Sequence, residues 1–195
     1  MELTEILKIE AFGNFIATYA SDLQHIKTFK FEKDQESRLS KFSKFLNEYR
    51  VARNVDKNKK DKLLKETEFE FNTPESIDSF AQILKTKRIT HSNSIMTSLC
   101  SKIAMLKEPQ QFIPIDGLAK KAIRYKKNNY QEFNTLAQLK FKDYKPEIIE
   151  FLNTYPNLIE PIEKQYPKLK KIKKIRVNRF YDKILWTAGK NGLSI

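Results

Sequence analysis

Lys102 and Asp116 are the two residues of this sequence whose types and spacing best suit chemistry. Each is predicted near the start of a helix, and the segment from Pro109 to Pro114 joins the two helices. Antiparallel packing would bring both starts to the same end of the pair, because the first helix runs away from that end and the proline segment returns the chain. The stretch from Leu99 to Tyr125 is therefore a candidate active site built from one local unit.

Lys102 has the surroundings that a nucleophilic amine needs. An amine attacks only in its neutral form, so it must be desolvated or lie near other positive charge. A helix start, here predicted with Asn93 or Ser94 as the cap, disfavours a cation through the helix dipole. Apolar side chains follow at helical spacing: Leu99, Ile103 and Leu106. The alternative is an ordinary solvated lysine, in a chain with 37 lysines and arginines.

Asp116 has two interpretations that are compatible with each other. A carboxylate before Gly117 can be the N-cap of the helix that runs to Tyr125, because its oxygen can accept the first free backbone N–H groups. The acid also follows an extended apolar segment, residues 112–115, that would bury the approach to it, and Gly117 lets another backbone come close. The residue could thus cap a helix and take part in catalysis.

The charge of the chain indicates a polyanionic partner. Lysine and arginine outnumber aspartate and glutamate by 37 to 24, which gives a net charge of +13. Basic surfaces bind nucleic acid through phosphate neutralisation and counterion release. The alternative is a compositional bias from an AT-rich genome.

Other classes of protein are disfavoured by the sequence. Cys100 is the single cysteine, so no disulfide framework and no cysteine zinc site is expected. The two histidines, His25 and His91, have no partner at metal-ligand spacing. Neither a membrane span nor a signal peptide is predicted, and we expect a cytoplasmic protein.

Apolar residues recur at helical spacing through most of the 195 residues, and only four glycines interrupt them. The pattern predicts an all-α, multi-helix bundle. A break is expected at Gly13, a helix start at Thr73, and a charge run at 56–65 suggests a lobe boundary near 56–72. The alternation of residues 68–71 favours a short strand. Further helices are expected at about 3–25, 36–53, 95–107, 117–125, 130–141, 146–153, 158–166 and 177–188.

Two parts of the sequence resemble a known family. Ser101-Lys102-Ile103-Ala104, Lys107-Glu108-Pro109-Gln110 and Ile113-Pro114-Ile115-Asp116 are similar to the core of the helix-hairpin-helix DNA glycosylases, of the 8-oxoguanine type. The family's glycine-rich turn before the lysine is replaced here by a segment without glycine. The end of the chain is similar to a shorter bacterial group with the same fold, through Arg179, Asp182, Leu185-Trp186 and Gly189-Lys190.

The resemblance implies a two-lobed glycosylase domain over residues 1–195, with the active site between the lobes. Lys102 would attack the sugar C1′ of an extruded nucleotide in double-stranded DNA, and Asp116 would stabilise the cationic sugar. If Lys102 is misplaced and does not reach the sugar, Asp116 could still activate a water molecule. The reaction would then be hydrolysis alone. No metal or cofactor is implied. The protein would act as a monomer at the nucleoid, in base-excision repair or against modified phage DNA.

Binding of DNA would use basic and aromatic side chains, although for each of them a solvated or core position is the alternative. Residues 167–179 contain seven basic residues and no acid. The residues expected to bind phosphate are Lys120, Lys121, Arg124, Lys170, Lys171, Lys173, Lys174 and Arg176. The residues expected to stack on an extruded base are Phe112, Tyr125 and Trp186.

Two other classes of function compete with this hypothesis. A helical protein could bind DNA or RNA without catalysing a reaction. A protein-interaction module could carry its basic charge incidentally. Salt-dependent binding without base release would identify the first class, and salt-insensitive or absent binding would favour the second.

Overall fold

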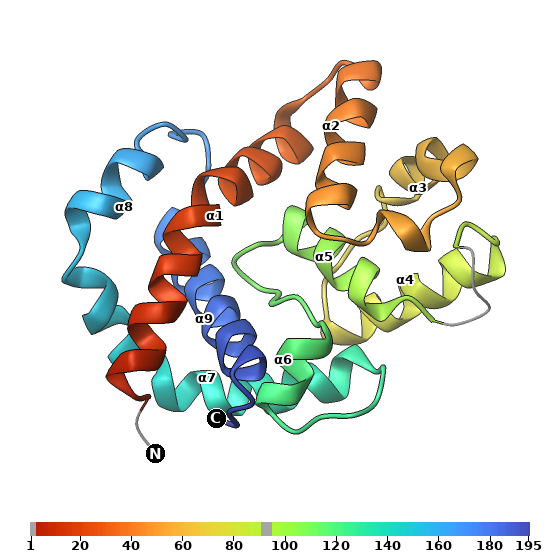
Figure 1. Ribbon diagram of the computed structural model, residues 1–195. Helices are drawn as coiled ribbons and strands as arrows, with labels where there is room; N and C mark the ends of the chain where they lie inside the picture. The colour runs from red at the N-terminus through yellow and green to blue at the C-terminus, as the bar shows by residue number, and fades with distance from the viewer. Residues whose placement is uncertain (1–2, 91–94) are drawn as a thin grey trace. The chain divides into compact units, whose positions relative to one another are not determined.

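The computed structural model describes residues 3–90 and 95–195, and these residues are all-α, as the sequence predicted (Figure 1). No strand occurs within the described ranges, and residues 68–71, where a strand was expected, are turn and irregular backbone. The chain forms two compact units. Unit 1 comprises Met1–Gln24, Ile115–Lys127 and Glu132–Ile195, and unit 2 comprises His25–Pro114 and Asn128–Gln131. Residues 56–72, where the sequence suggested a boundary, lie within unit 2.

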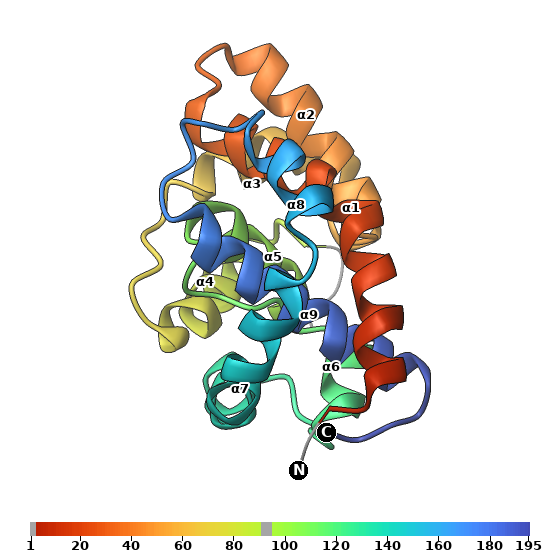
Figure 2. The same cartoon turned by 90° about the vertical axis from the view of Figure 1, so that its left-hand side faces the viewer.

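Unit 1 is built around aromatic side chains from distant parts of the chain. Phe180 packs edge-on against Phe15 at 5.6 Å between ring centroids and stacks on Phe151 at the same distance. The short helix α6 lies against the long helix α9 (Figure 2). The helices of this unit are the first part of α1 (Glu5–Phe31), α6 (Gly117–Ala122), most of α7 (Tyr130–Asn153), α8 (Pro156–Glu163) and α9 (Ile172–Lys190).

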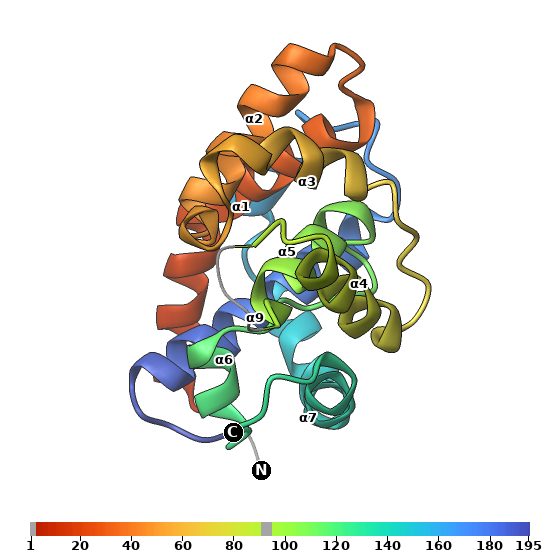
Figure 3. The ribbon, with the colours of Figure 1, turned by 90° about the vertical axis from the view of Figure 1, so that its right-hand side faces the viewer.

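Unit 2 has α5 as its central helix. The residues of α5 from Leu99 to Leu106 are all buried, and α4 lies beside it (Figure 3). A second aromatic cluster joins Phe69, Phe71 and Phe80 at centroid distances of 5.1–5.3 Å. The α-helices of this unit are the end of α1, α2 (Gln35–Glu48), α3 (Lys60–Glu66), α4 (Pro74–Thr86) and α5 (Thr97–Lys107), with single 3-10 turns at Ala52–Asn54 and Lys57–Lys59.

Two helices are longer than the sequence predicted. The helix α1 continues through Gly13 to Phe31, because one exposed glycine weakens a long helix without breaking it. The helix α7 continues through Pro146, so the two helices expected at 130–141 and 146–153 are one. Pro146 is exposed, which places its ring and its missing N–H on the solvent side of the helix.

The start of α7 is fixed by a side chain from another helix. Asp78 of α4 accepts hydrogen bonds from the backbone N–H groups of Tyr130 and Gln131, at 2.7 and 3.0 Å. The predicted start at Thr73 is confirmed, since α4 begins at Pro74, but the threonine side chain makes no capping hydrogen bond. Proline at the first helical position needs no N–H partner, which reduces the need for that bond.

Candidate functional site

Asp116 is the N-cap of α6, as predicted. Its backbone is extended, and its Oδ1 accepts hydrogen bonds from the N–H groups of Leu118 and Ala119, both at 2.9 Å. One carboxylate oxygen thus makes both capping bonds, and Oδ2 is not used by the cap. The side chain is half-buried, so the structure holds this carboxylate in a fixed orientation and leaves part of it accessible.

The helix that Asp116 begins is held against α9 by a close backbone approach. Gly189 of α9 is buried, and a Cβ atom built on it would lie 2.0 Å from the carbonyl oxygen of Leu118. Only glycine permits this distance. The other end of α6 is also fixed, because the carbonyl of Ala122 accepts a hydrogen bond from the N–H of Ile195 at 2.9 Å. These contacts set the position of the Asp116 carboxylate within unit 1.

A buried ionic cluster lies on the same helix α9. The Arg179 guanidinium bonds Asp22 of α1 through Nε at 2.9 Å and Nη2 at 2.8 Å, and its Nη1 is 3.1 Å from Asp182. The side chains of Arg179 and Asp22 are 1% and 4% exposed. Burial raises the pKa of Asp182, and the positive charges of Arg179 and Lys183 only partly oppose that rise.

Lys102 does not start its helix, and this expectation was wrong. The helix α5 begins at Thr97, which makes Lys102 an interior residue, and the predicted caps Asn93 and Ser94 lie outside the described residues. Interior residues do not experience the N-terminal dipole, which acts within the first turn. Lys102 is 9% exposed, and its Nζ donates a hydrogen bond to the carbonyl of Tyr49 at 3.3 Å. It belongs to unit 2, whereas Asp116 belongs to unit 1.

The basic residues expected to bind phosphate differ in how they are placed. Arg176 makes two bonds to Glu163, at 2.8 and 2.6 Å, and both side chains are nearly buried. This pair stabilises the fold, which leaves Arg176 poorly placed to bind an external phosphate. Arg124 is exposed, and its Nε donates to Ser194 at 3.0 Å. Lys120 is half-buried, and the remaining predicted lysines are exposed: Lys121, Lys170, Lys171, Lys173 and Lys174.

The three predicted stacking residues lie in different surroundings. Phe112 is 3% exposed in unit 2, where its ring meets Tyr130 edge-on at 6.2 Å. Tyr125 is buried in unit 1, and its hydroxyl donates to Glu132 at 3.4 Å. Trp186 is half-buried on α9, and the Lys190 amine lies 5.3 Å from its ring. Of the three, Trp186 exposes the largest fraction of its surface to solvent.

Sequence reasoning missed the ionic cluster of Asp22, Arg179 and Asp182. The i, i+3 spacing of Arg179 and Asp182 on one helix was a usable signal for that half of the cluster. Asp22 is separated from Arg179 by 157 positions, and no local pattern indicates the pairing. Within residues 3–90 and 95–195, no three His, Cys, Asp or Glu side chains are arranged to hold a metal ion.

No helix in the described part of the chain is both long and apolar enough to cross a membrane. Comparison with known proteins gives no match to this chain, whether with protein-family models, with curated proteins or with solved structures. The choice of function therefore depends on the residues and their geometry.

Proposed function

We propose that the protein is a DNA glycosylase that excises a damaged or modified base, with Asp116 as its catalytic carboxylate. The observation that carries the proposal is the geometry of Asp116, whose Oδ1 is fixed by two backbone N–H groups at 2.9 Å while Oδ2 is not used by the cap. A carboxylate fixed in this way does not need to reorganise when charge develops next to it.

The reaction suits a single fixed carboxylate. As the bond between the sugar C1′ and the base nitrogen breaks, the electron pair leaves with the base and positive charge develops on the sugar. The Asp116 carboxylate stabilises that charge and accepts a proton from a water molecule, whose oxygen forms the new bond to C1′. The base takes up a proton, and an abasic site remains. The target must first leave the stack, which costs a few kcal/mol.

The contacts of α6 support this assignment. Arg179, Asp182 and Gly189, which carry part of the resemblance to the glycosylases, all lie on α9, the helix against which α6 packs. Gly189 allows the close approach of α9 to the backbone of Leu118, two residues after Asp116. The net charge of +13 and the exposed lysines at 170–174 favour duplex DNA as the partner.

A lyase step would need an amine nucleophile, and Lys102 is the amine that the resemblance assigns to it. The neutral amine would displace the base at C1′ and lose a proton, and the sugar ring would open at the C1′–O4′ bond to give a Schiff base, from which the 3′ phosphate is lost by β-elimination. Lys102 is buried within α5 and bonded to the Tyr49 carbonyl. Base removal by Asp116 does not depend on this step, so the two activities are tested separately.

Base release from a panel of duplexes with single damaged or modified bases tests the assignment of Asp116. We expect abasic sites with the native protein, and a loss of at least about a hundredfold in Asp116→Asn, because asparagine retains the cap but not the charge. Asp34→Asn is the matched control, since Asp34 caps α2 through Ser37 at 2.7 Å. Equal activity in Asp116→Asn would overturn the assignment.

Borohydride trapping tests the lyase step. A covalent complex that is lost in Lys102→Gln and retained in Lys107→Gln, a substitution on the same helix, would assign the nucleophile to Lys102. Abasic sites without trapping would mean hydrolysis alone. Salt-dependent DNA binding with no product from any duplex would instead favour a non-catalytic nucleic-acid-binding protein.

A further inference from the structure

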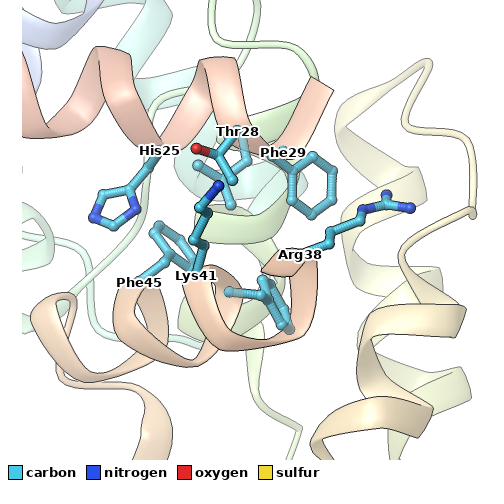
Figure 4. A pocket seen from close by; sticks show the side chains of 8 residues that line it. His25, Thr28, Phe29, Arg38, Lys41 and Phe45 are labelled. Carbon is cyan, nitrogen blue, oxygen red and sulfur yellow. The ribbon is translucent and has the colours of Figure 1, made fainter. Parts of the chain in front are cut away.

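The seven arginines of the chain, all of them within the described residues, fall into two groups. The first group is bonded to carboxylates inside the fold: Arg38, Arg176 and Arg179. Arg38, for example, bonds Glu68 at 3.2 Å, and its guanidinium lies 5.4 Å from the Phe29 ring (Figure 4). The second group is exposed and makes no ion pair with the described part of the chain: Arg50, Arg53, Arg88 and Arg124.

Three of the exposed arginines lie in a backbone conformation that normally selects glycine. Arg50, Arg88 and Arg124 have φ angles of 55°, 51° and 55°, and each directly follows the C-cap residue of a helix. In all three, the two hydrogen bonds of a Schellman turn close the helix end. Glycine is usual at this position, because a side chain strains the left-handed backbone. Lys171 is the one other non-glycine residue with positive φ in the described ranges, so all four such positions carry a cation.

The turns after α2 and α4 are joined within unit 2. The connection from α2 to α3, residues 49–59, begins with the first of these turns. Val55 of this connection forms an antiparallel bridge with Thr90, two residues after Arg88. The amine of Lys59 donates a hydrogen bond to the Arg88 carbonyl at 2.8 Å. Backbone pairing and this side chain therefore hold the two turns in one part of the unit.

The charge of these two segments is strongly one-sided. Residues 49–59 and 85–88 together contain seven basic residues and one acid. The acid, Asp56, is already paired with Lys59 at 3.4 Å. None of the large apolar side chains that are exposed in the described chain belongs to either segment. The exposed arginines of the two segments form what we call the arginine surface: Arg50, Arg53 and Arg88.

We propose that the arginine surface binds the phosphates of a nucleic-acid backbone, with each guanidinium donating to phosphate oxygens. A guanidinium presents a planar fork of donors that matches two oxygens of one phosphate. Positive charges gathered without acids repel each other, and a polyanion removes that repulsion. Glycine would fit the turns at Arg50 and Arg88 with less strain, but it cannot supply this contact.

The arginine surface adjoins the residue that holds the predicted lyase amine. Lys102 donates a hydrogen bond from Nζ to the carbonyl of Tyr49 at 3.3 Å, and Arg50 is the next residue in the chain. A backbone bound at Arg50 would therefore pass the end of α2 where this amine is held. The inference rests on the proposed function for the choice of duplex DNA as the nucleic acid. It adds the part of unit 2 that binds the DNA backbone.

Fluorescence anisotropy of a labelled duplex without damaged bases, measured across a salt series, tests the inference. We expect Arg50→Gly and Arg88→Gly each to lower the affinity about tenfold, because each removes a charge-assisted contact to phosphate. Each should also reduce the slope of log affinity against log salt by about one unit. Arg53→Gln, which lies outside the strained turns, should weaken binding in the same way.

Urea unfolding of the glycine variants separates DNA binding from a role in the turns themselves. Their unfolding midpoints should equal or exceed the native midpoint, because glycine relieves the strained backbone. Arginines that served only to complement the dipole at the helix ends would give the opposite results, a lower midpoint with unchanged DNA binding. Those results would overturn the inference.

Lys33→Gln is the matched control. Lys33 is exposed in the same unit and precedes α2, so it lies at the opposite end of that helix from Arg50. This variant should bind the duplex as the native protein does. Native affinity in both glycine variants contradicts the inference, and so does a native protein that does not bind the duplex. Tighter binding to vesicles of equal parts phosphatidylglycerol and phosphatidylcholine than to DNA would make an anionic membrane the partner and would also contradict it.

Base release, measured in parallel, separates this inference from the proposed function. DNA binding that the arginine variants weaken, in a protein that releases no base from any duplex, supports the arginine surface and refutes the glycosylase. Base release by the native protein, with unchanged DNA affinity in the arginine variants, refutes the arginine surface and leaves the assignment of Asp116 intact.

Discussion

The backbone of Leu118 lies so close to Gly189 that a Cβ atom on the glycine would come within 2.0 Å of the leucine carbonyl oxygen. The contact joins α6, which Asp116 begins, to α9, which carries the buried Arg179. The position of the candidate catalytic carboxylate therefore depends on the absence of a side chain at Gly189.

Gly189→Ala should destabilise unit 1 by about 3 kcal/mol or more, because the obstructing atom is backbone and the two helices must separate. Urea unfolding followed by circular dichroism measures the loss. Gly13→Ala is the matched control. Gly13 is an exposed helical glycine with nothing within 4 Å of its built Cβ, so alanine there should stabilise by about 0.5–1 kcal/mol. Similar unfolding midpoints for the two variants would refute the close approach.

Arg179→Met should lower the free energy of unfolding by about 3–5 kcal/mol, because it removes the guanidinium that pairs with the buried Asp22 carboxylate. Asp22→Asn, which removes the negative charge of the same pair, should lower the free energy of unfolding by a comparable amount. Lys127→Met serves as the comparison, since Lys127 and Glu132 form an exposed pair at 3.0 Å, worth about 0–1 kcal/mol. Losses of the same size at Arg179 and Lys127 would contradict a buried cluster.

Local sequence features predicted the structure best where the interacting groups are neighbours in the chain. Asp116 was identified as a cap because the N–H groups it accepts belong to the next three residues. Lys102 was misplaced because α5 starts with Met96 at its cap position, without a capping side chain. Thr97 instead bonds the distant carbonyl of Asn128 at 3.0 Å. A helix start set by tertiary contacts leaves no local signal.

The contacts that hold the candidate site in place could not be predicted either, because they join residues that are far apart in the sequence. The pair of Asp22 and Arg179 spans 157 positions. The sequence does not distinguish Gly189 from other helical glycines, because its importance comes from the contact with Leu118. Pro146 was expected to start a separate helix, and lies instead within α7 on its exposed face. In each case packing between distant segments outweighs local propensity.

Lys107→Met should destabilise unit 2 by about 1–2 kcal/mol. The Lys107 ammonium donates to the carbonyls of Thr67 at 2.9 Å and Phe69 at 2.8 Å, and so fixes this segment to α5. Faster amide hydrogen exchange in residues 67–71 should accompany the loss. Lys62→Met, an exposed substitution on α3, should change neither measurement. Unchanged exchange in Lys107→Met would show that the two hydrogen bonds do not hold the segment.

Glu32 should titrate well below the ordinary pKa of a glutamate. Its hydrogen bond from Lys41, aided by Ser37 and the Asp34 backbone, lowers its pKa from 4.5 to about 2. Because the folded pKa is the lower one, the stabilisation is present above pH 4.5 and is lost as pH falls towards 2. Carboxyl NMR should give this pKa directly, and Lys41→Gln should raise it more than Ser37→Ala. A pKa near the ordinary value in the native protein would argue against the Lys41 contact.

The exposed lysines of residues 170–174 and the neighbouring Arg176 should affect DNA binding differently. Replacing Lys170, Lys171, Lys173 and Lys174 by glutamine should reduce the slope of log affinity against log salt by about one unit for each phosphate that is no longer neutralised. Arg176→Gln should leave that slope unchanged and lower stability, because its guanidinium is bonded twice to Glu163. Filter binding of duplex DNA across a salt series gives the slopes. A reduced slope in Arg176→Gln alone would mean that this arginine leaves Glu163 to bind DNA.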